Sequence, residues 1–177
     1  MIHICSLARL NETVATTGAR HVVTLLRDIV VPRPPGIARA DHLVLRIDDI
    51  IDPLDGYTAP LDDHVDQLVR FVGRWDRATP IVFHCYAGIS RSTAAAYTTV
   101  CALNPDRDEH EIARAIRTAT PIAQPNSRFI ALADKALGRR GRMIEAIRAI
   151  GPGNGAYEGV PFRLDLAAAT SSPQDKA

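Results

Sequence analysis

The stretch HCYAGISRSTA, residues 84–94, comes directly after the apolar run PIVF at residues 80–83. A short apolar run of this kind is typical of a buried strand. The segment STAAAYTTVCAL, residues 92–103, consists mostly of small residues and is typical of a helix that packs closely at the centre of a domain. The stretch therefore predicts a tight connection from a buried strand to a central helix, with a cysteine, a glycine and an arginine inside the connection.

This connection contains the residues that an anion-binding loop needs. Between a strand that ends at His84 and a helix that begins near Arg91, successive backbone N–H groups can surround one point, at which the helix N-terminus is also aimed. Gly88 admits backbone conformations closed to other residues, and the planar guanidinium of Arg91 fits two oxygens of a phosphate or sulfate. The expected phosphate-binding residues are Tyr86, Ala87, Gly88, Ile89, Ser90 and Arg91.

Cys85 lies at the floor of the same loop. The dipoles that attract an anion also favour the thiolate, which is the nucleophilic form of a cysteine. Ser92 can donate a hydrogen bond to the sulfur and help it to leave when a phosphocysteine is hydrolysed, while His84 can support the loop from behind. The pattern predicts a nucleophilic sulfur held next to a bound phosphate.

Elsewhere the chain alternates short apolar runs with amphipathic segments, which predicts an α/β fold. The expected strands cover residues 2–7, 21–26, 42–47 and 80–83. The expected helices cover residues 61–75, 92–103, 108–119, 126–137 and 143–150. We expect a central mixed sheet of about four to five strands flanked by helices.

The expected domain organisation is a single domain over residues 1–150, followed by a loop and tail over residues 151–177. The glycine-rich segment GPGNGAYEG and the end SSPQDKA are typical of a loop and a frayed terminus, although VPFRLDL (160–166) could dock on the body of the domain.

Composition limits the possible functions. The 177 residues are 46% hydrophobic and carry a formal net charge of +1, so no overall field recruits nucleic acid or an anionic membrane. No apolar run is long enough to span a bilayer, and the start of the chain lacks a secretory signal pattern, so we expect a cytoplasmic protein. Cys5, Cys85 and Cys101 are too few and too scattered for a disulfide framework or a zinc site. The sequence says nothing about oligomeric state.

The pattern H-C-x-x-G-x-x-R-S at residues 84–92 resembles the signature loop of the protein tyrosine and dual-specificity phosphatases. HLVLRIDDI (42–50) resembles the strand that leads into the general-acid loop of that family, and TPIAQPNSRF (120–129) is similar to its P-x-x-x-P-N-x-x-F segment. The resemblance covers roughly residues 20–138. It implies a dual-specificity-phosphatase-like fold and hydrolysis of phosphate monoesters through a phosphocysteine, without a metal or cofactor.

That mechanism needs a carboxylic acid to protonate the leaving oxygen. The candidates are Asp48, Asp49, Asp52 and Asp55. We favour Asp49, which follows the strand at the position of the family's acid, although a short insertion in IIDPLDGYTAP (50–60) must then be assumed. Asp52, the second choice, and Asp55 would restore a shorter spacing to Cys85, and most of the four are ordinary loop carboxylates.

Asn126 and Cys5 each allow two interpretations. Asn126 either bridges to the cysteine loop, as the resemblance implies, or simply caps a helix. Cys5 reaches Cys85 only if their strands are neighbours with matching ends. Cys101, about 15 Å along a continuous helix, is too far from the loop for a disulfide and is expected in the core.

The expected substrate is a phosphorylated protein side chain or a small phosphomonoester. Because the variable loop positions carry no lysine, a single phosphate is favoured over inositol phosphates or phosphoinositides. No counterpart of a deep aromatic recognition loop is found, which favours dual specificity. The other interpretation is a pseudophosphatase-like module that binds phosphate without turnover.

Overall fold

The computed structural model of the chain describes residues 1–166. Within this range five strands form one sheet: β1 Ile2–Ser6, β2 His21–Leu25, β3 His42–Leu45, β4 Ile81–Cys85 and β5 Phe162–Leu164. Their order is β3-β2-β4-β1-β5, in which the first four run parallel and β5 is antiparallel to β1. The expected α/β fold with a mixed sheet is therefore confirmed.

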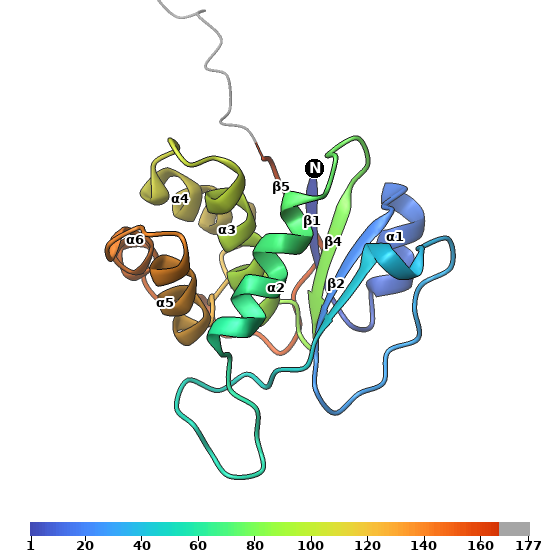
Figure 1. The fold of residues 1–177 in the computed structure, drawn as a ribbon, viewed down its shortest axis with the longest axis horizontal. Coiled ribbons are helices and arrows are strands. Elements are labelled where there is room, and N and C mark those ends of the chain that lie inside the picture. Colours follow the sequence, from blue (N-terminus) through green and yellow to red (C-terminus); the bar gives the residue numbers. More distant parts are fainter. Residues whose placement is uncertain (167–177) are drawn as a thin grey trace, which may run out of the picture.

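Six α-helices surround the sheet in the same range: α1 Leu10–Thr17, α2 Asp62–Gly73, α3 Arg91–Leu103, α4 Glu109–Ala119, α5 Ser127–Ala136 and α6 Arg142–Ala149. A short 3₁₀ helix covers Arg39–Asp41. Figure 1 shows α1 on one face of the sheet and α2 to α6 on the opposite face. No helix within residues 1–166 is long and apolar enough to cross a membrane.

Helix α3 is the centre of the domain. Every residue from Arg91 to Cys101 is buried, and the alanines at 94–96 are completely so, because small side chains let the helix lie close to the sheet and to α2, α4 and α5. The alternation of side chains along β4 directs Phe83 and Cys85 toward the α3 face and Val82 toward the α1 face. This alternation decides on which side of the sheet the Cys85 sulfur lies.

The sequence predicted most elements to within two residues at each end, but it missed α1 and β5. Helix α1 has only 8 residues and no side-chain cap, so it depends on burying Leu10 and Val14 against the sheet. Strand β5 has only 3 residues and lies in VPFRLDL, which does dock on the domain by pairing with β1. The terminal segment SSPQDKA lies outside the described residues.

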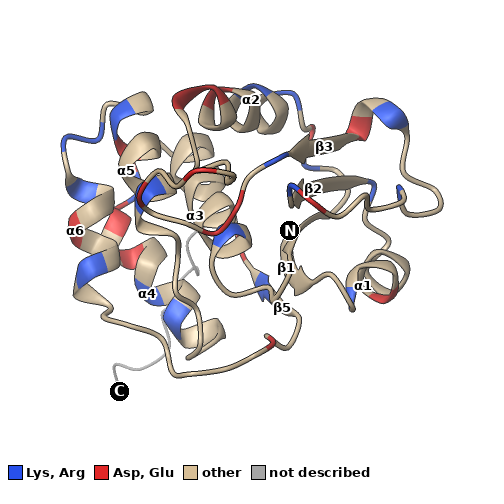
Figure 2. Cartoon of the chain, turned by 90° about the horizontal axis from the view of Figure 1, so that it is seen from below, with Lys and Arg blue, Asp and Glu red and all other residues tan. Residues whose placement is uncertain are grey.

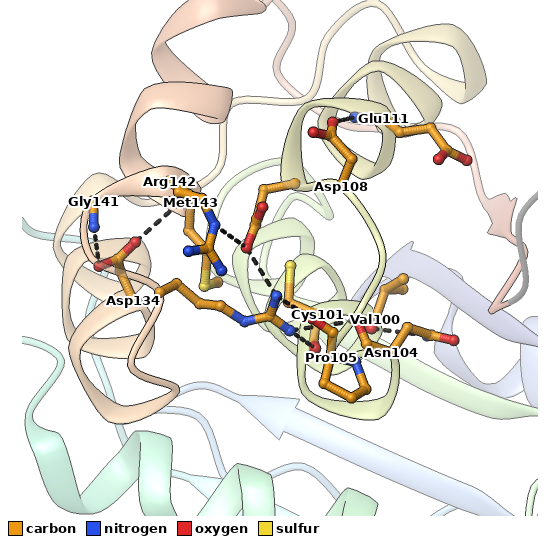
Figure 3. A network of polar contacts seen from close by, with 12 residues as sticks. Val100, Cys101, Asn104, Pro105, Asp108, Glu111, Asp134, Gly141, Arg142 and Met143 are labelled. Carbon is orange, nitrogen blue, oxygen red and sulfur yellow. Dashed lines mark hydrogen bonds and ion pairs between the residues drawn. The ribbon is translucent and has the colours of Figure 1, made fainter.

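A buried ionic network joins the outer helices to the end of α3 (Figure 3). Glu109, at the start of α4, accepts hydrogen bonds from Arg139 at 2.8 Å and from Arg142 at 3.0 Å. The Arg139 guanidinium also donates to the carbonyls of Cys101 and Pro105 at the end of α3. Both Glu109 and Arg139 are buried, and Glu109 supplies the carboxylate that compensates the Arg139 charge.

The Glu109→Ala variant should therefore lower the free energy of unfolding by about 3 kcal/mol, because it leaves the Arg139 charge buried without its carboxylate. Urea denaturation followed by circular dichroism measures this change. The matched control is Lys135→Ala, which removes an exposed ion pair with Asp62 and should change the stability little. Equal effects of the two substitutions would contradict a stabilising role for the network.

Candidate active site

The connection between β4 and α3 is a tight loop, called here the cysteine loop (residues 85–91). Gly88 has φ = 74°, and a Cβ there would lie 2.7 Å from the carbonyl carbon of Cys5 and 2.8 Å from the amide nitrogen of Ser6. Only glycine fits, because this part of the loop is pressed against the backbone at the end of β1. The Gly88 N–H donates to the sulfur of Cys85 at 3.3 Å.

The carbonyl groups of the cysteine loop are held on its outer side. They accept hydrogen bonds from backbone N–H groups of other segments: Leu7 to Tyr86, Gly159 to Ala87, Gln124 to Ile89 and Asn126 to Ser90. In a trans peptide the C=O and the next N–H point in opposite directions. Outward carbonyls therefore turn the following N–H groups inward, which is the arrangement of an anion nest.

Cys85 is buried, with 1% of its surface exposed. Besides the Gly88 N–H, its sulfur lies 3.3 Å from the hydroxyl of Ser92, in the first turn of α3. Two potential donors thus face the sulfur, which is the environment that a thiolate needs.

The side chain of Arg91, the first residue of α3, reaches the segment that follows β3. Its guanidinium donates to the carbonyl of Ile47 at 2.9 Å, whereas its buried Nε has no hydrogen-bond partner among the described residues. Nε lies 3.9 Å from the Asp49 carboxylate, too far for a hydrogen bond. Arg91 also lines a cavity, and a cationic residue with an unused N–H donor in such a place favours the binding of an anion.

Of the four aspartates considered, the structure brings Asp49 to the cysteine loop. The Asp49 carboxylate accepts hydrogen bonds from the Ser90 hydroxyl at 2.7 Å and from the Asn126 side-chain amide at 2.9 Å. Asp48 points elsewhere: it accepts from the Thr58 N–H at 2.7 Å and pairs with Arg27 at 3.2 Å.

Asp52 and Asp55 are exposed, and neither lines the cavity around Cys85. Of the four aspartates, Asp49 alone lines this cavity.

Asn126 combines the two interpretations that the sequence left open. Its side-chain carbonyl accepts from the Phe129 N–H at 3.0 Å and caps α5, while its side-chain amide donates to Asp49. Its backbone N–H also donates to Ser90 in the cysteine loop. One buried residue thus connects the start of α5 to both parts of the site.

A cavity of about 540 Å³ opens over the loop. Cys85, Arg91, Asp49 and Asn126 contribute to its walls, together with Ile51, Tyr86, Ala87, Ile89, Ser90, Gln124, Pro125 and Ser127. Tyr86 stands at the rim and is 63% exposed. Cys85, Arg91 and Asp49 therefore line the same cavity.

His84 lies behind the loop and is completely buried. Its Nε2 is 2.7 Å from the hydroxyl of Thr24 on β2, which in turn is 2.8 Å from Nε2 of His42 on β3. Burial lowers the pKa of His84 from 6.5 to about 4, so the imidazole is neutral near pH 7. The contact with Thr24 ties the His84 side chain to β2, and the neutral ring adds no charge behind the loop.

The other two thiols are separated from Cys85. Burial raises the pKa of both Cys5 and Cys101 to about 12, which disfavours their thiolates. The strands of Cys5 and Cys85 are neighbours, but Ser6 pairs with Cys85, and Cys5 faces the α1 side of the sheet. All three cysteines are free.

Comparisons with known proteins agree on the architecture. The structure of DUSP15 is similar with a TM-score of 0.63 at 17% identity, covering 84% of this chain and 89% of that one. Human DUSP28 gives a TM-score of 0.61 at 21% identity, with 78% and 92% covered. The human tyrosine phosphatase-like serine/threonine/tyrosine-interacting protein gives 0.61 at 16% identity, with the same coverage. The chain has the dual-specificity phosphatase fold.

At the level of sequence, no family model and no curated protein matches the chain. The dual-specificity phosphatase fold that the H-C-x-x-G-x-x-R-S pattern implied is therefore confirmed by the structure alone. Among the described residues no group of three or more His, Cys, Asp or Glu side chains is arranged to hold a metal ion.

Sequence reasoning missed three residues that support this site. Thr24 could be assigned only once the register of β2 against β4 was known, because it pairs directly with His84. Gly159 packs on the cysteine loop, where a Cβ would lie 3.2 Å from the Gly88 carbonyl; glycines in GPGNGAYEG were a possible signal of close backbone approach. Arg128, two residues after Asn126, donates to the carbonyls of Ile51 and Pro60 in the segment that follows Asp49, and the sequence carried no signal of these contacts.

The buried neutral His84 predicts a pH-dependent stability. In the unfolded chain a histidine binds a proton below its usual pKa of 6.5, whereas folded His84 resists protonation down to about 4. The contribution of neutral His84 to the free energy of unfolding is therefore fully present above pH 6.5 and is lost as the pH falls. When the pH is lowered from about 7.5 to about 5, the loss of this contribution should reduce the free energy of unfolding by about 2 kcal/mol.

Urea denaturation of the wild type and of His84→Gln over this pH range measures the contribution. The variant should be less stable at neutral pH, because Thr24 loses its imidazole partner, but its stability should depend less on pH. A pH dependence as steep as that of the wild type would contradict the burial argument.

Proposed function

We propose that the chain is a phosphate-monoester hydrolase that acts through a phosphocysteine on Cys85, with phosphorylated protein side chains as substrates. The observation that carries the proposal is that Cys85, Arg91 and Asp49 line one cavity, while the buried Nε of Arg91 has no hydrogen-bond partner among the described residues. The dual-specificity phosphatase fold of the solved structures supports it.

In the first step the Cys85 thiolate attacks the phosphorus, and the bond from phosphorus to the leaving oxygen breaks. The inward N–H groups of the loop and the Arg91 guanidinium stabilise the equatorial oxygens. Asp49, protonated in this step, gives its proton to the leaving oxygen. The departing group leaves as an alcohol or phenol, and the phosphoryl group stays on sulfur.

In the second step the ionised Asp49 takes a proton from a water molecule that attacks the phosphocysteine. The phosphorus–sulfur bond breaks and inorganic phosphate is formed. The Ser92 hydroxyl, 3.3 Å from the sulfur, stabilises the thiolate that leaves. The enzyme returns to its starting protonation state.

The cavity favours a substrate with one phosphate. Of the described residues that line it, Arg91 alone is cationic, so additional phosphates of an inositol ring would find no partner there. The exposed ring of Tyr86 at the rim suits an aromatic side chain. Tyrosine phosphate should react fastest because a phenolate leaves more easily than an alkoxide.

The purified protein should hydrolyse an aryl phosphate and a phosphotyrosyl peptide faster than a phosphoseryl peptide or an inositol phosphate, and a chelator should have no effect. Cys85→Ser should abolish turnover while retaining phosphate affinity, because the loop and Arg91 remain. Calorimetric titration with phosphate measures the affinity. Binding without turnover in the wild type would instead indicate a pseudophosphatase-like module, and turnover in Cys85→Ser would exclude the phosphocysteine.

A second set of variants tests the general acid. Asp49→Asn should lower turnover of an alkyl phosphate by roughly 10² to 10⁴, because the alkoxide then leaves without a proton. The loss should be smaller for an aryl phosphate, and substrate affinity should stay near normal or rise. Asp48→Asn, Asp52→Asn and Asp55→Asn serve as controls for steady-state kinetics on both substrates. Collapse of turnover in the Asp52 or Asp55 variant, with Asp49→Asn near normal, would show that Asp49 is not the general acid.

A further inference from the structure

The segment between β3 and α2 makes a long excursion that includes Asp49; residues 49–60 are called here the acid loop. Its two ends are joined, since the Asp48 N–H donates to the Thr58 carbonyl at 2.8 Å and the Asp48 carboxylate accepts from the Thr58 N–H. Figure 1 shows the loop projecting beyond the end of the sheet, and Figure 2 shows it crossing in front of α3 beside α5. Most of its residues, 51–57, are exposed.

Arg128, the second residue of α5, spans this loop. Its Nε donates to the carbonyl of Pro60 at 2.7 Å, and another guanidinium nitrogen donates to the carbonyl of Ile51 at 3.1 Å. One planar side chain thereby connects the first part of the loop to its last residue. A lysine, with a single charged nitrogen, could not make both contacts in the same fixed geometry.

The contacts of Arg128 continue those of Asn126. The Asn126 amide donates to the Asp49 carboxylate and lies 3.4 Å from the carbonyl of Ile50, and Arg128 holds the carbonyl of Ile51. Three consecutive residues of the acid loop are therefore tied to the first turn of α5. The position of the Asp49 carboxylate depends on that turn.

The charge of Arg128 is itself unfavourable in this place. A cation in the first turn of a helix opposes the helix dipole, and within residues 1–166 no carboxylate forms an ion pair with Arg128. The carbonyl groups of Pro60 and Ile51 accept hydrogen bonds from the guanidinium and stabilise its charge there. The side chain thus fits a role in holding the loop better than a role in stabilising α5.

We propose that Arg128 is a positioning residue that holds the acid loop so that the Asp49 carboxyl reaches the leaving oxygen. This inference rests on the proposed function, because it assigns the acid step to Asp49. Without the guanidinium, the exposed residues 51–57 keep the Asp48–Thr58 contact but lose their attachment to α5. A displacement of the carboxyl by about 1 Å is enough to reduce proton transfer by up to about 100-fold.

The test compares Arg128→Ala and Arg128→Lys with the wild type on an alkyl phosphate and on an aryl phosphate with a good leaving group. Both variants should lose turnover of the alkyl phosphate by about 10-fold to 100-fold and turnover of the aryl phosphate much less. The inhibition constant of inorganic phosphate should be unchanged, because the cysteine loop is intact. Lys135→Ala, on the same helix, is the control and should leave both rates unchanged.

A double variant separates positioning from general damage. In the Asp49→Asn background, Arg128→Ala should cause no further loss beyond about twofold, because its effect passes through the carboxyl that is already absent. Hydrogen exchange of the amides of residues 50–58 should become faster in Arg128→Ala, while the circular dichroism spectrum stays that of the wild type. This readout does not depend on activity.

Two kinds of failure are distinguishable. If the wild type turns over both phosphates and Arg128→Ala lowers both rates equally, or neither, the positioning role is rejected and the proposed function stands. An additive loss in the double variant also rejects it. If the wild type hydrolyses neither substrate, the proposed function fails and this inference fails with it, whatever the exchange data show.

Discussion

The outward hydrogen bonding of the cysteine-loop carbonyls is the constraint on which the rest of the site depends. The covalent chain alone does not fix the orientation of the peptide units in a tight loop, because each unit can rotate about its flanking ψ and φ angles. Here the N-terminal strand, the segment before α5 and the segment before β5 each donate an N–H to a different carbonyl. Segments more than a hundred residues apart, Leu7 and Gly159, thus fix adjacent peptide units. The anion nest is a property of the whole domain.

The same organisation extends to the acid side of the cavity. Helix α3 begins inside the loop and supplies Arg91 and Ser92, while α5 begins beside the loop and supplies Asn126 and Arg128. The side chains that orient the sulfur and the carboxylate therefore come from the first turns of two packed helices. Helices are rigid compared with loops, which explains how an exposed acid loop can still present one carboxylate reproducibly.

The sequence predicted what local chemistry determines and missed what only tertiary contact determines. The spacing of Cys85, Gly88 and Arg91 predicted a strand, an anion loop and a helix, because those residue types have few other uses together. The local sequence does not distinguish Asp48 from Asp49, because they are adjacent and chemically identical. They differ in their tertiary partners: Asp48 pairs with Thr58 and Arg27, whereas Asp49 accepts hydrogen bonds from Ser90 and Asn126. Arg128 was unpredictable for the same reason, since its acceptors are backbone carbonyls distant in sequence.

Strand alternation also decides the chemistry of the buried thiols. Cys5 and Cys85 are on neighbouring strands, but their register is offset by one residue, so their side chains lie on opposite faces of the sheet. A disulfide between them would require one strand end to turn over, which the contact of Gly88 with the Cys5 backbone opposes. The third thiol, Cys101, is almost three turns along α3 from Arg91 and is buried among its helices. The fold thus places Cys85 at the wall of the cavity and separates its sulfur from the thiols of Cys5 and Cys101.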